Sequence, residues 1–582
     1  MYLIEKLNKD IKTIIKDLGY ETDVNVTVSN RPELGDYQFN GCMAIAGSNH
    51  LNPRDLAEKI VSELSKIEDY TNINIAGPGF INITLSDKVL IDYMNTINKD
   101  YEKNLYKIDK ERLIMLDYGG ANVAKELHVG HLRTANIGEA LKRLLVSCGY
   151  KTISDVHLGD WGRPMGLVML EIKKRMPDLV FFKEDYKGEY PIDCPIKGEE
   201  LNTIYPYAST RAKEDETYLN EAREITVKLQ SGNPGYTALW KTILNESCKD
   251  IKKTYDLLNA TFDLWEGESD VDPIIPEMVD YLEKNNYTEM SDGAEVIHVK
   301  EETDKREIPP FMVKKSDGGV LYDTTELATI WSRVKRFNPD EIWYVTDNRQ
   351  ELHFVQAFRA AYKTNICSKD TNLVHLSVGT INGSDGKPFK TRDGGVMSLK
   401  KLIQLVYDEC YKKIGDNVSE DEKSNLASTV AMSAIKYADL LPNRTSDYIF
   451  DPVKFSDTQG KTGPYLLYNT VRIKSIFTKV KDANIKYDNY YKITNPLERE
   501  IILHLINLSS VLERAVEGKI LNEICEYIFK LTNLYNSFYA ESHILNEKDK
   551  DTQSSWLVMS DIVLKTNLFI LNMLAIDVPE KM

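Results

Sequence analysis

The sequence predicts a multidomain α/β protein, in which a doubly wound parallel sheet lies between an N-terminal α+β unit and an all-helical C-terminal region. The order strand, loop, helix, strand in residues 113–158 is typical of a parallel sheet, which binds ligands where its strands end. Strand and helix patterns alternate over residues 1–105, and strand patterns vanish beyond about residue 400. A chain of 582 residues is long enough for roughly three to five domains of about 150 residues.

The N-terminal unit is predicted from four patterned segments. An apolar stripe at helical spacing predicts a helix over residues 1–20, and alternation predicts a strand over 24–30. Residues 52–67 have a helical pattern, and residues 72–86 form two strand patterns around a Gly-Pro-Gly turn. We expect this unit to end near residue 105, where a polar linker begins.

The central region, residues 106–400, begins with an apolar strand at 113–118. A glycine-containing loop follows, then a helix from about His131 that ends before Gly149, and a second strand at 152–158. Residues 170–310 are more charged, have helical patterns, and are interpreted as an insertion. Strand patterns resume at 341–347 and 373–379, and helical patterns then run through residues 401–582.

The composition is that of a soluble globular protein, with 42% hydrophobic and 28% charged residues. The 73 basic and 89 acidic side chains give a net charge of −16, which excludes a wholly cationic nucleic-acid coat. RNA binding stays compatible with this charge, because basic residues can gather on one face.

The seven cysteines are scattered and form no C-x-x-C pair, which argues against zinc fingers and a disulfide framework. No run of residues approaches the roughly 18 apolar positions of a membrane span. The N-terminal residues mix acidic and basic side chains, unlike a signal or transit peptide. We therefore expect a cytoplasmic protein with no membrane partner.

The first chemical motif is His128-Val129-Gly130-His131, in the loop after the first central strand and at the start of a helix. A helix N-terminus offers free backbone N–H groups and a partial positive charge, which suit phosphate. The imidazoles add hydrogen-bond donors without permanent charge. Gly130 would leave room for a base or ribose against the backbone. A metal site is disfavoured, since no third ligand lies near the two histidines.

The second motif is the lysine segment, residues 383–395, in which glycines flank three basic side chains after the strand at 373–379. A glycine-rich segment with lysines can close over a triphosphate and stabilise the charge that develops during transfer. By itself it is equally compatible with a solvated basic turn. The sequence does not contain G-x-x-x-x-G-K-[ST], so it is not a Walker loop.

HVGH followed by a distant KPFKT resembles the two signature motifs of class I aminoacyl-tRNA synthetases. NVAKELHVGHLRTANIGEALKRLL, VHLGDWGRPMG, VKLQSGNP, DGKPFKTRDGG, KYADLLPNRTSDYIFD and PEKM resemble arginyl-tRNA synthetases, as do GDYQFN and AGPGFIN near the N-terminus. The resemblance covers nearly the whole chain. It implies an N-terminal tRNA-elbow-binding domain (1–105), a Rossmann-like catalytic domain (106–400, insertion about 170–310) and a helical anticodon-binding domain (401–582).

The resemblance also implies the chemistry of the site. Arginine and ATP would give arginyl-adenylate and pyrophosphate, and arginine would then pass to the 3′ end of tRNA-Arg, with Mg²⁺ on the phosphates. In this family the tRNA is usually needed for the first step as well. Catalysis would rest on positioning and charge stabilisation by His128, His131, Lys387 and Lys390. ATP would also contact Gly130, Asp347 and His353.

A guanidinium calls for carboxylates that can accept paired N–H donors. The resemblance implies the following arginine-binding residues: Asp117, Asn122, His157, Tyr322, Glu326 and Gln350. Tyr322 and Glu326 would share a helix face. His157 and Asp160 lie in VHLGDWG, for which a structural role is equally compatible with the sequence.

The helical region is expected to bind the anticodon arm of tRNA-Arg. Residues 454–481 interleave aromatic and basic side chains, a mixture that suits single-stranded RNA loops, and the residues that we assign to tRNA are Tyr465, Tyr468, Arg472 and Lys474. An amphipathic core helix with solvated cations is the alternative. We expect a monomer.

The chain departs from the family pattern at three places. Gly119-Gly120 stand where serines are common, Glu326 stands where aspartate is common, and Pro388-Phe389 replace Met-Ser of the common lysine motif. Two other functions would share part of this pattern. A related adenylate-forming transferase should lack the helical domain and the acidic pocket, and a non-catalytic RNA-binding paralogue would usually lose a signature histidine or the second lysine.

Overall fold

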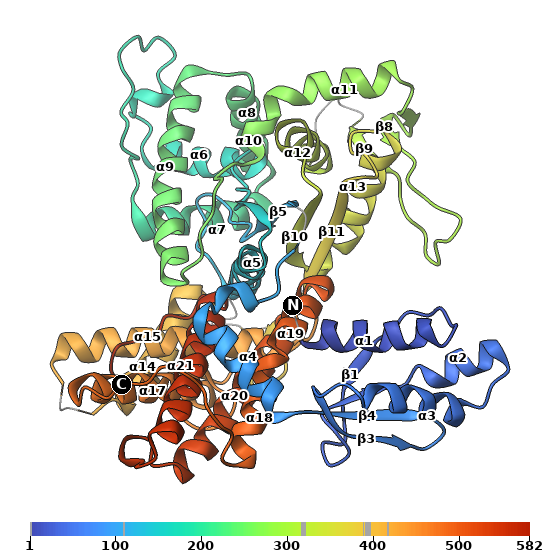
Figure 1. The fold of residues 1–582 in the computed structure, drawn as a ribbon. Coiled ribbons are helices and arrows are strands. Elements are labelled where there is room, and N and C mark those ends of the chain that lie inside the picture. Colours follow the sequence, from blue (N-terminus) through green and yellow to red (C-terminus); the bar gives the residue numbers. More distant parts are fainter. Residues whose placement is uncertain (1–2, 109–110, 316–321, 388, 390–396, 416–417) are drawn as a thin grey trace.

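The computed structural model describes residues 3–108, 111–315, 322–387, 389, 397–415 and 418–582. Figure 1 shows an N-terminal unit in dark blue beside a helical C-terminal region in orange and red, with the central sheet and its helices above. The fold class predicted from the sequence is confirmed.

The N-terminal unit is an antiparallel sheet, ordered β1-β2-β4-β3, with helices packed against it. Its elements are α1 (Leu3–Asp17), β1 (Val26–Val28), β2 (Tyr37–Phe39), α2 (Cys42–Asn49), α3 (Pro53–Leu64), β3 (Tyr70–Ala76) and β4 (Phe80–Leu85). The chain continues into α4 (Asp87–Lys99), which packs against α18 and α21 of the C-terminal region, and into the 3-10 turn η1 (Glu102–Asn104). Asn52 caps α3 by accepting a hydrogen bond from the Arg54 N–H, and Pro53 fills the first helical position. The expected strand pair around the Gly-Pro-Gly turn is β3 and β4.

The central sheet is parallel throughout and ordered β11-β10-β5-β6. Its strands and the helices that follow them are β5 (Leu113–Tyr118), α5 (Val129–Ser147), β6 (Lys151–Asp155), β10 (Glu341–Asp347), α13 (Glu351–Lys363) and β11 (Asn372–Val378). From β5 the chain proceeds to β6 on one side, whereas β10 and β11 extend the other side. The strand order therefore reverses between β5 and β10, where doubly wound sheets bind ligands.

A long segment joins β6 to β10. Between β6 and β10 the chain forms α6 (Arg163–Arg175), η2 (Val180–Phe182), α7 (Gly198–Glu214), α8 (Glu216–Gln230), α9 (Pro234–Leu257), α10 (Glu268–Val271), η3 (Asp272–Ile274), α11 (Ile275–Lys284), β7 (Glu289–Ser291), β8 (Ala294–Ile297), β9 (Phe311–Lys314) and α12 (Tyr322–Phe337), and the expected insertion, residues 170–310, lies within this stretch. The 3-10 turn η4 (Asn348–Gln350) follows β10. Strands β7, β8 and β9 form a small antiparallel sheet that the helical patterns of this region did not predict.

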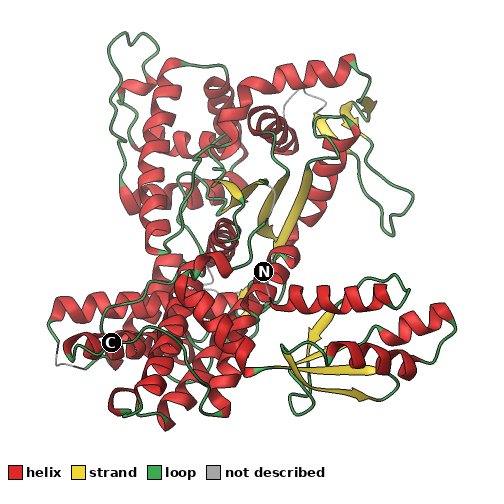
Figure 2. Cartoon of the chain, in the orientation of Figure 1, coloured by secondary structure: helices red, strands yellow, loops and turns green. Residues whose placement is uncertain are grey.

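The C-terminal region is built almost entirely of helices, as Figure 2 shows in red. Its elements are β12 (Ile381–Asn382), α14 (Leu399–Lys413), α15 (Glu420–Leu440), β13 (Tyr448–Ile449), α16 (Pro452–Phe455), α17 (Gly463–Asp482), α18 (Pro496–Ile506), α19 (Leu508–Gly518), α20 (Asn522–Glu541), η5 (Ile544–Asn546) and α21 (Lys550–Met573). The expectation that strands vanish beyond about residue 400 is wrong at β13, which pairs with β12 in parallel.

One described helix, α21, has the length and apolar composition of a membrane span, with mean hydropathy 1.2 over an 18-residue window. This differs from the expectation that no run of residues is apolar enough over about 18 positions to span a membrane. The window is 72% buried inside the protein, and α21 packs against α4, α5, α17 and α20. Core helices of soluble domains have the same composition, because their whole circumference is covered by neighbours.

Candidate active site

A cavity of about 580 Å³ opens where the strand order of the central sheet reverses. Its walls are formed by the loop after β5, the first turn of α5, the loop after β6, and the ends of β10 and η4. The sequence-predicted residues that line it are Asp117, Asn122, His128, Gly130, His131, His157, Glu326, Asp347 and Gln350. The structure thus brings together predicted residues that lie more than 200 positions apart in the chain.

The two signature histidines cap the helix that carries them. His128 is the N-cap of α5, and its Nδ1 accepts a hydrogen bond from the Gly130 N–H at 3.1 Å. His131 Nδ1 accepts in turn from the His128 N–H at 3.0 Å. This reciprocal arrangement is a capping box, which satisfies two backbone donors of the first turn. Helix α5 begins at Val129, two residues earlier than the sequence predicted.

Both rings are neutral at physiological pH. Burial lowers the pKa of His128 to about 4 and that of His131 to about 3, and the ring centroids lie 4.0 Å apart. Because each Nδ1 accepts a backbone hydrogen bond, the proton of each neutral ring resides on Nε2. The pair therefore offers N–H donors at the cavity wall without net charge.

Glycines allow the chain to make this loop. Gly119 and Gly120 have φ angles of +93° and +46°, in the left-handed region that favours glycine. A Cβ on Gly119 would lie 3.0 Å from the Tyr255 hydroxyl, which donates a hydrogen bond to the Gly119 carbonyl. A serine at this position would therefore be strained here. Gly130 lines the cavity and also accommodates the capping ring of His128, whose Cε1 would be 2.9 Å from a Cβ.

The lysine segment is attached to the histidine motif. The Val129 N–H donates to the Met397 carbonyl at 3.1 Å, and the Leu399 N–H donates to the Leu127 carbonyl at 2.9 Å. In the described part of the segment, the exposed Lys387 follows a turn in which its own N–H donates to Asp385. Lys390 and Pro388 lie outside the described residues.

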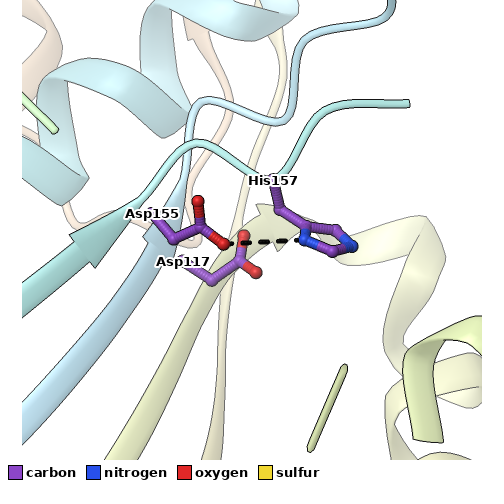
Figure 3. A group of neighbouring side chains, drawn as sticks. All are labelled: Asp117, Asp155 and His157. Atoms are coloured by element: carbon purple, nitrogen blue, oxygen red, sulfur yellow. Dashed lines mark ion pairs between the residues drawn. The ribbon is translucent and has the colours of Figure 1, made fainter. Parts of the chain in front are cut away.

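Two aspartates at the cavity floor are paired with a buried arginine. Arg333, on α12, is 2% exposed, and its Nη2 donates to Asp117 at 2.6 Å and to Asp155 at 2.7 Å. Figure 3 shows the two carboxylates at the ends of adjacent strands β5 and β6, with the His157 ring beside them. His157 Nδ1 lies 3.6 Å from Asp155. Sequence reasoning missed Arg333, and no local pattern distinguishes it from other helix arginines.

The charges at the floor are set by this arrangement. Burial would lower the pKa of His157, but Asp155 and Asp117 raise it to about 9, so the ring is cationic at neutral pH. Its φ of +37° is unusual for a residue with a side chain and turns the chain sharply after β6. Burial raises the pKa of Asp117, and Arg333 opposes that rise.

Asp117, Asp155 and His157 have the composition of a metal site, since their ligand atoms lie within 4.8 Å of one another. The Arg333 guanidinium already donates to both carboxylates from the position that a cation would take. These residues therefore fit an internal ion-pair cluster better than a Mg²⁺ site.

Two further glutamates face the cavity. Glu326 is buried, its Oε1 has no hydrogen-bond partner among the described residues, and its Oε2 lies 3.8 Å from His353. Glu268, at the start of α10, also lines the cavity and forms no ion pair within the described part of the chain. Burial raises the pKa of Glu268 to about 7. Sequence reasoning missed Glu268 because it lies in the segment interpreted as an insertion.

Asp160 holds Glu268 in place. The Asp160 carboxylate accepts hydrogen bonds from the backbone N–H of Ser269, at 3.0 Å, and from its hydroxyl. The Glu268 N–H donates to the Leu158 carbonyl at 3.1 Å. Of the two roles considered for the loop after β6, the contacts of Asp160 are structural, whereas His157 lines the cavity.

The other predicted residues differ in their contacts and in whether they reach the cavity. Asn122 pairs with Gly159 across a β-bridge, and Asp347 forms an ion pair with Arg349 at 2.7 Å. His353 is absent from the cavity wall, because its Nδ1 lies 2.9 Å from Asp323. Burial would lower its pKa, but Asp323 and Glu326 raise it to about 9. Helix α12 begins at Tyr322, whose side chain lies outside the described set.

A second hollow, of about 550 Å³, lies in the helical region between α17 and the end of α20. It is lined by Tyr468, Arg472, Tyr539 and the C-terminal Met582, and Tyr468 is 44% exposed. The Arg472 guanidinium stacks on Tyr468, with 4.9 Å from its Cζ to the ring centroid. We call this hollow the aromatic groove.

The other two residues assigned to tRNA lie beside the aromatic groove and are already paired. The Tyr465 hydroxyl donates to Asn533 at 2.6 Å, and Lys474 forms a 2.8 Å ion pair with Glu580 near the C-terminus. Neither lines the groove. The amphipathic interpretation of α17 thus describes Tyr465, whereas Tyr468 is exposed and the half-buried Arg472 lines the groove beside it.

Three family models match the chain in order. Residues 3–85 match a model described as the arginyl tRNA synthetase N-terminal domain. Residues 95–452 match one described as the catalytic domain of class I (R) tRNA synthetases, and residues 466–582 match the DALR anticodon binding domain.

Curated proteins resemble the chain over its full length. It is 44% identical to the arginine–tRNA ligase of Alkaliphilus oremlandii and 42% identical to that of Agathobacter rectalis, with 100% of each chain covered in both comparisons. A crystal structure of arginyl-tRNA synthetase from Plasmodium falciparum has the same fold, with a TM-score of 0.80 at 24% identity over 100% of this chain and 99% of that one.

Proposed function

Because the chain belongs to the arginyl-tRNA synthetases, and is thus an ATP-dependent arginine–tRNA ligase, we propose that the cavity between β5 and β10 is the site of arginine activation. The observation that supports this assignment is a wall with two distinct halves. Two glutamates that form no ion pair with any described arginine face two neutral histidines at a helix N-terminus. The first half suits a cation and the second suits phosphate.

The guanidinium of arginine would bind between Glu268 and Glu326. Arg333 and His157 compensate Asp117 and Asp155, so these aspartates are poor acceptors for a second guanidinium. The Oε1 of Glu326, which has no hydrogen-bond partner among the described residues, would gain one from the guanidinium. We therefore assign the cation to the two glutamates, and assign Asp117 to the floor beneath them. The cationic His157 would attract the α-carboxylate of the substrate, and Asn122 and Gln350 would contact its polar end.

In the first reaction, a carboxylate oxygen of arginine attacks the α-phosphorus of ATP in line and pyrophosphate leaves. The Nε2–H groups of His128 and His131, with the N-terminus of α5, would donate to phosphate oxygens as charge builds on them. Lys387 and Lys390 would neutralise the leaving pyrophosphate. No side chain forms a covalent bond, so the residues act by positioning and charge stabilisation.

Mg²⁺ would accompany the phosphates of ATP, because this ion usually keeps several waters and binds through substrate phosphates rather than an all-protein cage. The Asp117–Asp155–His157 cluster is not assigned to it, since Arg333 fills that space. Asp347, at the rim, is paired with Arg349.

In the second reaction, a ribose hydroxyl at the 3′ end of tRNA-Arg attacks the acyl carbon and releases AMP. The aromatic groove would bind a base of the anticodon arm, since an exposed tyrosine and a stacked arginine suit an unstacked base. We assign the domains to residues 1–105, 106–400 and 401–582, with the first at the tRNA elbow. We further propose that the enzyme is a cytoplasmic monomer.

Arginine-dependent exchange of pyrophosphate into ATP tests the proposal. We expect exchange with arginine alone among the twenty standard amino acids, and only when tRNA is present, because the family usually needs tRNA to complete its site. Exchange with a different amino acid would overturn the pocket assignment. Exchange with arginine but without tRNA would overturn only the tRNA requirement.

The KM for arginine should fall as pH rises from 6 to 8. Burial raises the pKa of Glu268 to about 7, and only the ionised carboxylate attracts the guanidinium. Below pH 7 protonation should raise KM by up to about tenfold per pH unit. His157 and His353, with pKa values of about 9, stay cationic over this range. Glu268→Gln should remove the pH dependence, and a flat profile in the unmodified enzyme would contradict the assignment of Glu268.

Tyr468→Ala should weaken tRNA binding without altering arginine binding. Loss of one stacked base costs about 1–3 kcal/mol, which predicts a rise in the KM for tRNA of roughly 5- to 150-fold. Tyr465→Phe is a matched control, because the Tyr465 hydroxyl is used within the protein and its ring is away from the groove. Aminoacylation at varied tRNA concentration measures both. An equal effect of the two variants would show that α17 contributes only stability.

A further inference from the structure

The segment KYADLLPNRTSDYIFD, residues 436–451, has no role in the site described so far. We call it the junction segment. It covers the end of α15 and strand β13, and it joins three parts of the protein. Arg444 donates to the Ser377 carbonyl at the end of β11, at 2.8 Å, and the Tyr437 hydroxyl donates to the Cys525 carbonyl of α20, at 3.0 Å. The third contact is with the histidine helix α5.

That contact is a buried ion pair. Arg133 lies on α5 two residues after His131, and its Nε is 2.9 Å from Asp439. Arg133 is 1% exposed and Asp439 is fully buried. Asn136, on the next turn of α5, donates to the same carboxylate at 2.8 Å. Removing one partner of such a pair leaves an uncompensated buried charge.

Arg133 also reaches β13. Its Nη1 donates to the Ser446 carbonyl at 2.7 Å, and its guanidinium lies over the Tyr448 ring, 5.2 Å from Cζ to the centroid. Arg133 thus contacts the junction segment through a carboxylate, a backbone carbonyl and an aromatic ring. These contacts fix the position of β13 relative to the first turns of α5.

Strand β13 supports the lysine segment. β12, which directly precedes the segment, pairs with β13 through Ile381–Tyr448 and Asn382–Ile449. The ring of Phe389, two residues after Lys387, packs on Phe450 with centroids 5.4 Å apart. The described part of the segment that bears Lys387 is therefore attached at both sides to β13.

The residues that follow the lysine segment, 397–399, are attached directly to the start of α5. Ser398 pairs with His128 across a β-bridge, and the backbone bonds of Met397 and Leu399 flank it. The near end depends on β13, and β13 depends on Arg133. The chain on both sides of the lysine segment is therefore held by the first turns of α5, which carry His128 and His131.

We propose that Arg133, through its ion pair with Asp439 and its contacts with β13, is a positioning residue for adenylation that aligns Lys387 with His128 and His131. The proposal rests on the proposed function of the cavity. Arg133 touches no substrate, and the glutamates assigned to arginine are on other elements. Its loss should therefore affect the turnover of ATP rather than the binding of arginine.

Asp439→Asn tests this in the full-length enzyme. Tested by pyrophosphate exchange with saturating tRNA, it should lower kcat about 100-fold, the effect of misplacing a catalytic group by roughly 1 Å. The KM for arginine should change less than about threefold, since uniform ground-state binding is untouched. Tyr448→Leu removes the ring under Arg133 and no charge, so it keeps the test available if Asp439→Asn does not fold. It should lower kcat in the same direction by a smaller factor, again with the arginine KM unchanged.

Asp304→Asn is the matched control. Asp304 forms a bidentate pair with Arg359 at 2.8 Å in a half-buried position, and it contacts neither signature motif. It should lower the melting temperature without lowering kcat. The positioning role is overturned if folded Asp439→Asn keeps its kcat, if its arginine KM rises in step with the fall in kcat, or if Asp304→Asn lowers kcat equally. Exchange activity of the unmodified enzyme is measured in parallel, so failure of the proposed function would be seen separately.

Discussion

Replacing Glu326 with glutamine should raise the KM for arginine by about 30- to 150-fold while changing the KM for ATP by less than about threefold. The carboxylate is buried, and its Oε1 has no partner among the described residues. A charge-assisted hydrogen bond from a guanidinium contributes roughly 2–3 kcal/mol at such a position. The amide keeps the shape of the side chain but removes its charge. Steady-state pyrophosphate exchange with each substrate varied in turn measures the two constants.

Glu266→Gln is the matched control for this prediction. Glu266 precedes the pocket residue Glu268 by two positions, but its carboxylate is used by Arg336, at 2.7 and 2.9 Å. It should leave both KM values unchanged. If Glu326→Gln raised the KM for ATP as much as that for arginine, Glu326 would support the cavity as a whole. The division of the cavity into a guanidinium-binding half and a phosphate-binding half would then be wrong.

The parts of the site that the sequence predicted are those encoded by neighbouring residues. His128, Gly130 and His131 form their capping box within four positions, so a local pattern is enough to place them at a helix start after a strand. The strands at 341–347 and 373–379 are confirmed for the same reason, since each is a short apolar run with clear boundaries. Family resemblance added the order of the domains, and the three family models match the chain in that order.

The parts that could not be predicted depend on contacts between distant residues. Asp117 lines the cavity, but its ion-pair partner Arg333 lies 216 positions away along the chain. Glu268 faces the cavity because Asp160, more than 100 positions earlier, holds Ser269. A lone glutamate or arginine on a helix is usually solvated, so neither residue carries a local signal of its role. Long-range pairing of charges, rather than any motif, decides which carboxylates remain for the guanidinium.

Contacts between distant residues also explain two departures from the family pattern. Glycines replace serines at 119–120, and at Gly119 the positive φ and the nearby Tyr255 hydroxyl leave little room for a side chain. Glu326 extends one methylene further than an aspartate, and Asp323, one turn earlier, is paired with His353. The pocket floor is thus built from groups that neutralise one another, and the longer glutamate reaches past them into the cavity.

Replacing His128 with asparagine should lower kcat for adenylation by about 100- to 1000-fold with little loss of stability. Asparagine is among the best N-cap residues, so its side chain can still accept the hydrogen bond from the Gly130 N–H. It cannot supply the Nε2–H that would donate to a phosphate oxygen. Pyrophosphate exchange measures the catalytic loss, and thermal unfolding measures whether the cap survives.

Glutamine at position 128 should have the opposite effect: it keeps a donor for the phosphate and loses the cap of α5. Its amide nitrogen reaches the place of Nε2 but does not cap the helix, so His128→Gln should lose about 1 kcal/mol of stability and regain part of the activity. The low pKa values of His128 and His131 make a separate prediction about how kcat depends on pH. Since both rings are already neutral at pH 6, kcat should not rise between pH 6 and 8 through their deprotonation. If asparagine were as active as histidine, the imidazole at 128 would serve only to begin α5, and the phosphate half of the cavity would have to rely on backbone N–H groups and lysines.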